Sequence, residues 1–473
     1  MSMVIRIAQE EWRTLLRNRA GVIATMLLVA LVLVAAFVSL ERRTRIEADR
    51  AGYQASVDAD FDKQPARHPH RMVHYGQFVF RPLAPLAFFD TGVDSYTGNT
   101  IFLEGHRQNS ANFAEARQSS LLLRFGQLTP AFVLQTLAPL LLIFLAFTSV
   151  ARERERGTLR LLRAQGVDGP RLVAGKLMGH GAIALAIGLP AFLVLIGFAA
   201  MGMADWAPIA LLILGYAVWL LIWAMLAVVI SCFASRSRDA LAALVALWMV
   251  GVILLPRALP EVAAVETILP TRIETEVALH RDLARIGDSH DPEDPYFNAF
   301  KQRTLARYGV SRVEDLPVQY AGLVGMEGER LSTDLYARAT NEVSAREASQ
   351  NARVHGFAVL SPLIAIRQLS MALTASDVTA HQDFLDQAEA FRYRFVQTLN
   401  RMQAVLIPHI GGEDPRVSAE NWKRVPRFAY QPYDPLRSNA ASIGGNLMVL
   451  LGWLVGLSVL ATLAARRIGG IVR

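Results

Sequence analysis

The chain has 473 residues, of which 53% are hydrophobic and only 19% are charged, and its formal net charge is +7. This composition is too apolar for an ordinary soluble enzyme of this length and indicates a protein that crosses a membrane several times. The single cysteine, Cys232, lies inside an apolar run, which excludes a disulfide framework or a thiolate metal cluster within one chain.

Six apolar stretches have about the length needed to cross the hydrocarbon core of a bilayer, which takes roughly 20 helical residues. They are Gly21–Leu40, Pro130–Val150, Leu177–Ala200, Pro208–Phe233, Ala240–Leu255 and Ile443–Ala465. The fifth stretch has only 16 residues, and it either tilts little or extends past Pro256. We therefore predict an all-α polytopic membrane protein with six transmembrane helices, and the even number puts both termini on one side.

The N-terminal region, residues 1–20, contains EEWRTLLRNR and is predicted to form an amphipathic helix at the cytoplasmic surface. The first span, residues 21–40, lacks a small-residue cleavage site and is therefore not expected to be a cleaved signal peptide. Residues 41–129 open with ERRTRIEADRAGYQASVDADF, and this charge-rich pattern predicts that the first span continues as a helix beyond the membrane.

The distribution of Lys and Arg predicts the orientation, because basic flanks are retained on the cytoplasmic side. With both termini inside, the cytoplasmic segments hold 16 basic and six acidic residues. Three arginines, Arg42, Arg43 and Arg45, argue for the opposite orientation because they follow the first span on the proposed outer face. The longer basic loop after the second span (residues 130–150) outweighs them.

That loop, residues 151–176, contains RERERGTLRLLRAQGVDGPRLVAGK, with seven basic residues against three acids. Leu159 and Leu162 fall on one helical face and three arginines on another, which predicts an amphipathic helix along the inner membrane surface. GVDGP then ends this helix, and the chain returns to the membrane through spans three to five, within residues 177–255.

Residues 256–442 are expected to form a large, mainly helical extracytoplasmic domain, followed by the last span, residues 443–465, and a cytoplasmic tail, residues 466–473. Within LSTDLYARATNEVSAREASQNARV and HQDFLDQAEAFRYRFVQTLNRMQAVL, apolar residues recur at helical spacing. One acidic cluster lies in IGDSHDPEDPYF, where two prolines favour a solvated turn over a metal site. We expect no metal site in the chain.

The loop around residues 152–176 resembles the segment of ABC-2-type ABC transporter permeases in which a coupling helix containing Gly-Thr-Leu meets the ATPase subunit. The six-span topology, EEWRTLLRNR and the short CFASRSRDA loop are similar to that family as well. The stretches HYGQFVFRPLAPLAFFDTGVDSYTGNTIFLEGHRQN and SPLIAIRQLSMALTASDVTAHQDFLDQAEAFRYRF resemble, more narrowly, a bacterial subfamily with large extracytoplasmic domains that is grouped with copper-enzyme maturation permeases.

The resemblance implies which residues couple the chain to an ATPase: Arg154, Glu155, Gly157, Thr158 and Leu159. It also implies a cytoplasmic nucleotide-binding ATPase dimer, a second permease that is identical or paralogous, and location in the bacterial inner membrane. The chain contains no GxxxxGK[ST] sequence, so ATP and Mg²⁺ are expected in the partner subunit and no catalytic or cofactor-binding residue here. No nucleic-acid partner is expected. The alternative role for the basic loop is anchoring to anionic lipid, which does not account for the interleaved Glu153 and Glu155.

Two functions fit this architecture: a transport permease, and an ATP-driven transducer that acts mechanically on an extracytoplasmic partner without transport. The apolar faces of the extracytoplasmic helices have three possible partners: each other, a second permease, or a ligand. We expect the second, a subunit contact through Phe384, Phe391 and Phe395 that caps the exit of the transport path.

Overall fold

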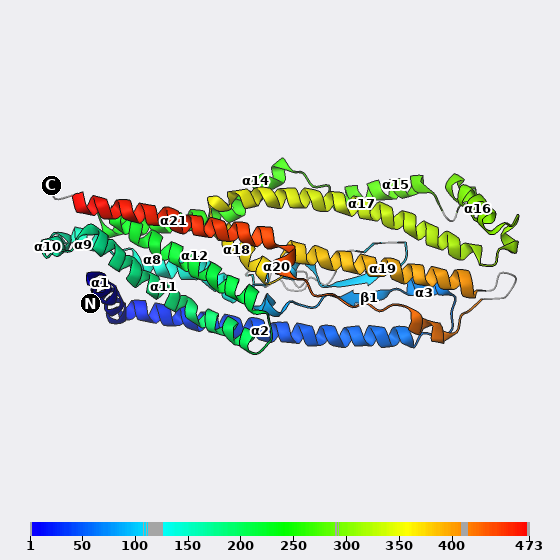
Figure 1. Ribbon diagram of the computed structural model, residues 1–473, viewed down its shortest axis with the longest axis horizontal. Coiled ribbons are helices and arrows are strands. Elements are labelled where there is room, and N and C mark those ends of the chain that lie inside the picture. Colours follow the sequence, from blue (N-terminus) through cyan, green and yellow to red (C-terminus); the bar gives the residue numbers. More distant parts are fainter. Residues whose placement is uncertain are drawn as a thin grey trace.

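A computed structural model describes residues 2–106, 108–109, 111, 126–288, 291, 293–407 and 415–470. The molecule is elongated, with a helical bundle at one end and an extramembrane domain at the other (Figure 1). The helix α1 (Met3–Arg17) and the C-terminal end of α21 (Ala440–Gly470) both lie at the free end of the bundle (Figure 1). Because both lie at the same end of the bundle, the chain crosses the bundle an even number of times.

Within the described residues, six helices are long and apolar enough to cross a membrane, as the sequence predicts. They are Arg19–Asp62, Pro130–Glu155, Gly169–Ala200, Trp206–Phe233, Ser237–Glu266 and Ala440–Ile468. Four spans are single helices: α2 (Arg19–Asp62), α11 (Gly169–Ala200), α12 (Trp206–Phe233) and α21. The second span consists of α7 (Pro130–Phe132), η2 (Val133–Leu137), α8 (Ala138–Ala146) and α9 (Ala151–Glu155). The fifth span consists of α13 (Ser237–Trp248), η3 (Met249–Leu254) and α14 (Leu255–Glu266). The chain is an all-α polytopic membrane protein.

The helix α2 continues far past the apolar stretch that predicted the first span. It begins after Asn18, whose side chain accepts a hydrogen bond from the amide of Gly21 at 3.2 Å, and it runs for 44 residues. Beyond Leu40 the charged residues support the helix with pairs one turn apart, such as Glu41 with Arg45. Figure 1 shows α2 running without interruption from the bundle into the extramembrane domain. The predicted extension of the first span as a helix is thus confirmed.

The fifth span also extends past the apolar stretch, because the chain stays helical through Pro256. The π-helix η3 immediately precedes α14, and Pro256 lies in the first turn of α14. A wide π turn relieves the clash and the missing hydrogen bond that proline brings to a regular helix. Of the two alternatives for this short apolar stretch, little tilt or extension past Pro256, the structure shows the extension.

The extramembrane domain is built mainly from two long helices that lie side by side, α17 (Tyr320–Gly356) and α19 (Val378–Leu406) (Figure 1). Gly322 lets them approach closely, because a Cβ atom there would lie 2.4 Å from the backbone nitrogen of Ala404. The other described helices of the domain are α3 (Pro69–Tyr75), α4 (Asp94–Thr97), α15 (Arg272–Ile286), α16 (Pro295–Tyr308) and α20 (Pro435–Ser438), with the 3₁₀ turns η4 (Val313–Asp315) and η6 (Ala419–Arg424). The 3₁₀ turns η1 (Pro85–Phe88) and η5 (Phe357–Val359) contribute Leu86, Phe88 and Ala358 to the core of the bundle.

A two-stranded antiparallel hairpin completes the extramembrane domain, and the sequence did not predict it. It pairs β1 (Gln77–Phe80) with β2 (Thr100–Leu103) in the register Gln77 to Leu103. The hairpin packs against α2 and α19. It therefore fixes the first extramembrane segment of the chain, which follows α2, onto the second.

One helix of the predicted extracytoplasmic segment 256–442 belongs to the membrane bundle instead. The helix α18 (Pro362–Leu373) packs against α12 and α21, and its buried side chains are part of the same hydrophobic core as those of the spans. Gly215 of α12 leaves room for Leu369, which lies 2.5 Å from where a Cβ atom would be. With 12 residues, α18 is too short to cross a bilayer, which is why its apolar sequence did not suggest a span.

Candidate functional site

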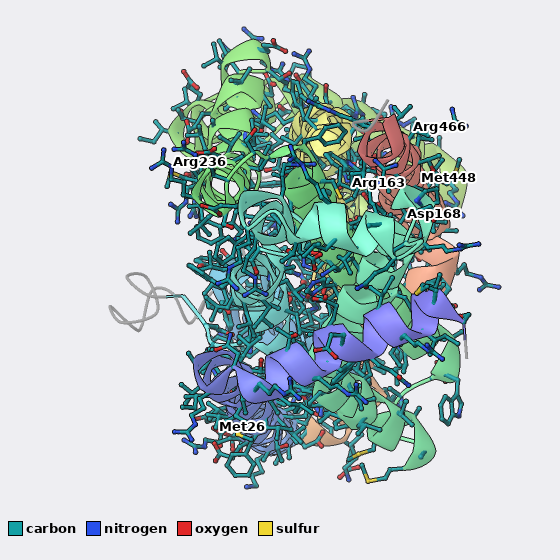
Figure 2. All side chains as sticks on the ribbon, turned by 90° about the vertical axis from the view of Figure 1, so that its left-hand side faces the viewer. Met26, Arg163, Asp168, Arg236, Met448 and Arg466 are labelled. Atoms are coloured by element: carbon teal, nitrogen blue, oxygen red, sulfur yellow. The ribbon has the colours of Figure 1, made fainter. Side chains whose placement is uncertain are left out.

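The α9–α10 segment at the free end of the bundle is two short helices rather than one. The predicted amphipathic helix breaks at Gly157, whose φ of +73° is in the left-handed region, and α10 (Thr158–Ala164) starts immediately after it. Glycine adopts this conformation without the steric cost that a Cβ atom imposes. A sharp corner therefore divides the segment, and Figure 2 views this end of the molecule, with Arg163 and Asp168 labelled.

The five residues implied to couple the chain to an ATPase divide into two groups. Arg154 and Leu159 point inward: Arg154 donates hydrogen bonds to the carbonyl oxygens of Cys232, at 2.6 Å, and Ala234, and Leu159 is only 8% exposed. Glu155, Gly157 and Thr158 are exposed. The inward pair holds the segment to the bundle, whereas Gly157 and Thr158 lie at its surface.

The end of α12 holds α9 in place through the hydroxyl of Ser231. This hydroxyl accepts hydrogen bonds from the amides of Val150 and Ala151, at 2.9 and 3.0 Å, and donates one to the carbonyl oxygen of Phe147 at 2.8 Å. Amides in the first turn of a helix have no partner within the helix, so a buried side chain that satisfies two of them fixes the position of that turn. The α9 helix is therefore bonded to α12 at its start.

Glu155 connects α9 to the start of α13. Its carboxylate accepts hydrogen bonds from the amide of Ser237 at 3.1 Å and from the Ser237 hydroxyl at 2.9 Å. A carboxylate at a helix N-terminus satisfies a free amide and interacts favourably with the helix dipole. Together with Arg154, which binds the carbonyl oxygens at the end of α12, Glu155 ties α9 to both ends of the α12–α13 loop. The interleaving of Glu and Arg in RERER thus has a structural explanation.

A buried ion network links α9 to α1 and α11, and the sequence analysis missed it. The ammonium of Lys176 lies 2.7 Å from the carboxylates of both Glu11 and Glu153, and His180 Nε2 lies 3.1 Å from Glu11. Lys176 is only 6% exposed. The four residues come from three elements far apart in sequence, so no local pattern reveals the network. Since charges are costly to bury without partners, these contacts make the relative position of the three helices specific.

Glu11, which lies outside the spans, has a perturbed pKa. Burial alone would raise this pKa, but the hydrogen bond with His180 and the charge of Lys176 outweigh burial and lower the pKa from 4.5 to about 2. A carboxyl group with a lower pKa in the folded state stabilises that state above its unfolded pKa, and this contribution is lost as the pH falls toward 2. Glu11 therefore remains ionised throughout the neutral range.

Two glycines let α1 lie directly on α11. A Cβ atom on Gly175 would be 2.5 Å from Cβ of Ile7, and one on Gly179 would be 2.8 Å from Cβ of Glu11. Glycines four residues apart form a groove that admits a second helix in close contact. The amphipathic N-terminal helix is thus part of the packed bundle, and it crosses the view in Figure 2.

The outer face of α9–α10 is exposed in the part of the chain that the structure describes. Arg152, Arg156 and Arg160 are exposed, and Leu161 of α10 keeps 64% of its surface. An exposed leucine next to Thr158 and between arginines gives a small apolar contact with a charged rim. This composition is typical of a protein contact, whereas a purely lipid-binding surface needs only the basic residues.

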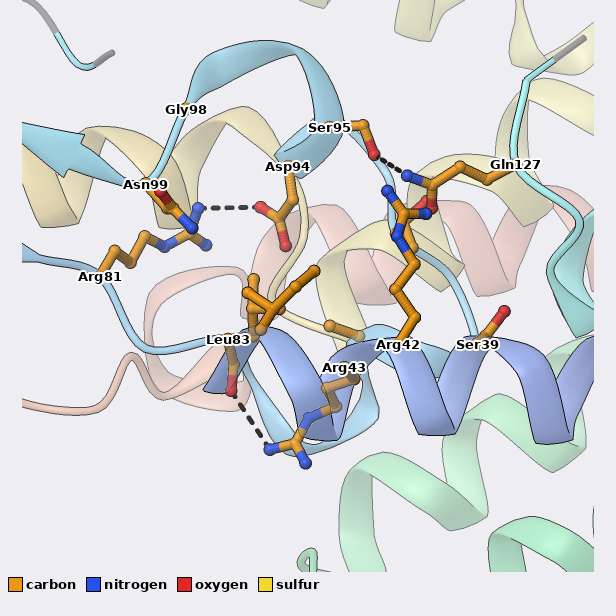
Figure 3. A pocket seen from close by; sticks show the side chains of 13 residues that line it. Ser39, Arg42, Arg43, Arg81, Leu83, Asp94, Ser95, Gly98, Asn99 and Gln127 are labelled. Carbon is orange, nitrogen blue, oxygen red and sulfur yellow. Dashed lines mark hydrogen bonds and ion pairs between the residues drawn. The ribbon is translucent and has the colours of Figure 1, made fainter. Parts of the chain in front are cut away.

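A second polar site lies where α2 leaves the bundle, and it contains two of the three arginines that argued against the predicted orientation, Arg42 and Arg43 (Figure 3). Arg43 donates hydrogen bonds to the carbonyl oxygens of Ala84, at 2.9 Å, and Leu83, at 3.3 Å. Arg42 lines a pocket there with Arg81 and Asp94. Arg43 therefore has a structural role within the chain, which weakens its value as evidence on orientation.

Asp94, the acidic residue of this pocket, has a raised pKa. Arg81 and Asp94 form a buried ion pair at 2.8 Å, and Arg81 also donates to the carbonyl oxygen of Ala375 at 2.9 Å. Burial raises the pKa of Asp94 to about 6, although the Arg81 guanidinium acts to lower it. Burial likewise raises the pKa of Asp90 from its ordinary value. The junction between the bundle and the extramembrane domain is thus a polar connection whose carboxyl groups are costly to ionise.

The three phenylalanines expected at a subunit contact are inside the chain itself. Phe384 and Phe395 have no exposed surface and Phe391 has 1%. They form the core of the extramembrane domain with side chains such as Phe61 of α2, whose ring centroid lies 5.7 Å from that of Phe395. The expected contact with a second permease through these residues is therefore wrong, because the helical apolar face closes within one chain.

The acidic cluster interpreted as a turn includes His290, which lies outside the described residues. The carboxylate of Asp294 caps α16, accepting hydrogen bonds from the amides of Phe297 at 2.9 Å and Asp288 at 3.0 Å. Asp291 and Glu293 are exposed. The described part of this cluster therefore serves a helix terminus.

Comparisons with known families divide the chain into two matched regions. Residues 105–270 match the model described as an ABC-2 family transporter protein, and residues 272–431 match a domain of unknown function, DUF3526. The first region contains α9, α10 and spans two to five, and the second covers most of the extramembrane domain. No curated protein matches the chain. The segment around Gly157 lies within the transporter match.

Proposed function

We propose, for a chain that belongs to the ABC-2 family of transporter permeases and carries an additional extramembrane domain, that it moves a substrate across a bacterial inner membrane. The energy comes from ATP, which binds with Mg²⁺ to a dimer of separate nucleotide-binding subunits on the cytoplasmic side. The chain itself supplies no catalytic group. Its contribution is to convert the movement of the ATPase into rearrangement of the spans.

The observation that carries this proposal is the attachment of α9–α10. The segment presents Glu155, Thr158 and Leu161 on its outer face. At the same time it is bonded to α12, α13 and α11, and through Lys176 of α11 it is linked to α1. Arg163 also donates a hydrogen bond to the carbonyl oxygen of Ile468 near the end of α21 at 3.0 Å. A partner that pushes on this segment therefore acts on several spans together. Simple anchoring to lipid would not require these bonds.

We expect the substitution Leu161→Asp to separate the chain from its ATPase. The change places a charge in the centre of the proposed contact, where apolar burial is lost and an unpaired carboxylate is desolvated. The measurement is affinity purification of the full chain from host membranes in mild detergent, followed by assay of Mg²⁺-dependent ATP hydrolysis in the eluate. The variant should retain less than about a tenth of the hydrolysis, which corresponds to about 1.4 kcal/mol of lost contact.

The matched control is Ile273→Asp, the same kind of change at a side chain that is 74% exposed in the extramembrane domain. It should leave hydrolysis and co-purification unchanged, and both variants should be present in membranes at wild-type amounts. Full co-purification of the ATPase with Leu161→Asp would leave only lipid anchoring for the exposed face of α10.

The proposed orientation places α9–α10 and both termini in the cytoplasm and the extramembrane domain outside. Its support is the excess of basic residues at the α9–α10 end, which the positive-inside rule assigns to the cytoplasm. In a Cys232→Ser background, single cysteines at the exposed positions Ser56, Thr340 and Thr158 test it. An impermeant maleimide applied to spheroplasts should label the first two cysteines and label Thr158→Cys only after lysis. Labelling of Thr158→Cys alone in intact spheroplasts would invert the orientation.

A second permease, identical or paralogous, is part of the proposal. The spans differ in how much of their most apolar stretch is buried within the chain. The buried share is 56% for the span that begins at Pro130, 50% for the one at Gly169 and 61% for the one at Trp206. For those that begin at Arg19, Ser237 and Ala440 the values are only 28%, 17% and 22%. The three spans with the lower values, which are the first, fifth and sixth in the chain, therefore present apolar surface to lipid or to a second permease.

A transducer that acts on an extracytoplasmic partner without transport is the second candidate, and one observation favours it. The helix α2 is continuous from the bundle into the core of the extramembrane domain, where Phe61 is fully buried. Movement of the first span would therefore reach the extramembrane domain directly. Stimulation of hydrolysis by a small transported molecule supports the permease, whereas stimulation by a protein partner supports the transducer.

A further inference from the structure

Three histidine side chains come together on the surface of the extramembrane domain. His70 and His74 lie on α3, and His106 lies just after β2. Their ligand nitrogens are all within 4.8 Å of one another, and the His70 and His74 rings are in hydrogen-bond contact through their Nε2 atoms at 3.2 Å. The spacing of these three side chains suits the binding of a metal ion.

Local geometry directs the first two histidines to the same side. They are four residues apart on a helix, which places them one above the other on one face. Pro69 occupies the first turn of α3, and the His68 side chain caps the helix by accepting a hydrogen bond from the amide of His70 at 3.2 Å. The short helix thus begins at a defined position, and the pair is prearranged by the sequence HPHRMVHY.

The third histidine reaches the pair because the chain after β2 is pressed against α3. The amide of Gly105 donates a hydrogen bond to the carbonyl oxygen of Val73 at 3.2 Å, and a Cβ atom on Gly105 would lie 2.2 Å from the Val73 side chain. His106 itself has φ of +64°. A left-handed conformation at a residue other than glycine is unfavourable and is concentrated at functional sites. Here it turns the imidazole back toward α3.

We propose that His70, His74 and His106 bind a divalent late first-row transition metal ion, with Zn²⁺ as the representative case. Neutral imidazole is a preferred ligand of these ions, and about 2.0–2.1 Å bonds at tetrahedral angles put neighbouring nitrogens about 3.3 Å apart. The His70–His74 separation already matches this value, and His106 closes on the ion by side-chain rotation. His74 is exposed, so the fourth position faces solvent and remains open to water or an exchangeable ligand.

A buried carboxylate supports the third ligand from behind. Glu329 of α17, which has no exposed surface, accepts a hydrogen bond from the backbone amide of His106 at 3.2 Å, and its Oε2 lies 3.8 Å from His106 Nδ1. Metal-bound histidines commonly have a carboxylate at the second ring nitrogen, which orients the ring and raises its basicity. Glu329 therefore acts as a positioning residue, and it is held in turn by Arg392 of α19.

The test uses the full chain in detergent, stripped with a chelator, its affinity tag removed, and titrated with Co²⁺ as a spectroscopic substitute for Zn²⁺. Wild type should bind one equivalent and develop the strong visible absorption of tetrahedral Co²⁺, which added Zn²⁺ abolishes. The exposed His74→Ala should weaken binding by more than the roughly 10–100-fold that loss of an outer-shell partner costs. His106→Ala should do the same.

The matched control is His280→Ala, which removes an exposed histidine of α15 and should bind Co²⁺ as wild type does. Since His74 is exposed, its loss should leave the elution profile and melting temperature of the metal-free protein unchanged, so reduced binding is not a folding defect. Equal Co²⁺ affinity and spectra in wild type and His74→Ala would overturn the proposal, and the three rings would then be a hydrogen-bonded cluster only. Either result leaves the proposed coupling to an ATPase unaffected, because that contact is at the other end of the molecule.

Discussion

Replacing Lys176 with methionine should destabilise the folded protein by about 3–5 kcal/mol, the usual cost of removing one partner from a buried ion pair. The ammonium lies 2.7 Å from both Glu11 and Glu153, whose side chains are 11% and 22% exposed. Methionine fills most of the same volume, so the loss is chiefly electrostatic: two carboxylates remain close together without their shared cation. The melting temperature of the purified protein should fall by at least about 5 °C.

Arg171→Met is the matched control for this prediction, because it removes a basic side chain five residues earlier on the same helix. Arg171 is 56% exposed and lies 3.6 Å from Asp168, so its pair should contribute only about 0–1 kcal/mol. Adding Glu11→Gln to Lys176→Met should restore part of the stability, since one of the orphaned charges is then removed. An unchanged melting temperature in Lys176→Met would show that α1 and α9 do not depend on the network.

The substitution Arg392→Met should unfold or loosen the extramembrane domain, again with a cost of about 3–5 kcal/mol. Arg392 is 1% exposed and donates hydrogen bonds to Glu329 of α17 and, at 2.7 Å through two nitrogens, to Glu389 of its own helix. It also bonds Thr333 at 2.9 Å. Loss of the guanidinium removes the ion-pair partner of the fully buried Glu329 between the two long helices.

Limited proteolysis of the full chain in detergent measures this effect, with cleavage within α17 and α19 expected to be much faster in the variant. Arg330→Met is the control, because Arg330 is 44% exposed and its contacts with Glu327 and Asp334 are at the surface. Combining Arg392→Met with Glu329→Gln should slow the cleavage again. Cleavage of Arg392→Met at the wild-type rate would mean that the apolar core alone holds the two helices together.

The spans and the extension of the first one were predictable because they depend on local patterns. An apolar run of sufficient length has few alternatives to a membrane helix, and the charged continuation after Leu40 has the composition of a helix. The fifth span was ambiguous for a local reason as well. Pro256 suggested an end, and only the structure reveals the π turn before it that lets the helix continue.

The side of a helix that faces a neighbour was less predictable than the helix itself. The recurrence of Phe384, Phe391 and Phe395 correctly indicated an apolar face, but periodicity does not state what covers it. Phe428 and Tyr430, which follow α19 in the chain, lie against Phe384 and Phe391, whereas Phe61 at the end of α2, far away in the sequence, lies against Phe395. Similarly, the 12 residues of α18 are apolar enough for a core helix in either place, and their position in the bundle depends on the small residue Gly215.

The α9–α10 segment could be located from its sequence motif, but the contacts of its individual residues could not be predicted. The motif located the segment, yet Leu159 and Arg154 serve its attachment, while Leu161 was not singled out. Gly157 was visible in the sequence, but its left-handed conformation follows from the corner that the fold imposes. The ion network joins Glu11 to Lys176 across 165 residues, and three-dimensional packing alone creates such a pair.

Because α2 is one continuous helix, a tilt of its end in the bundle moves its other end in the extramembrane domain. At a rise of about 1.5 Å per residue, its 44 residues span about 66 Å, with the bundle near one end and Phe61 in the extramembrane core near the other. A tilt of about 5° at the bundle would swing the far end by about 6 Å, roughly the length of one helical turn. Angular changes too small to disturb packing in the bundle would thus become displacements large enough to exchange one set of side-chain contacts for another at the far end.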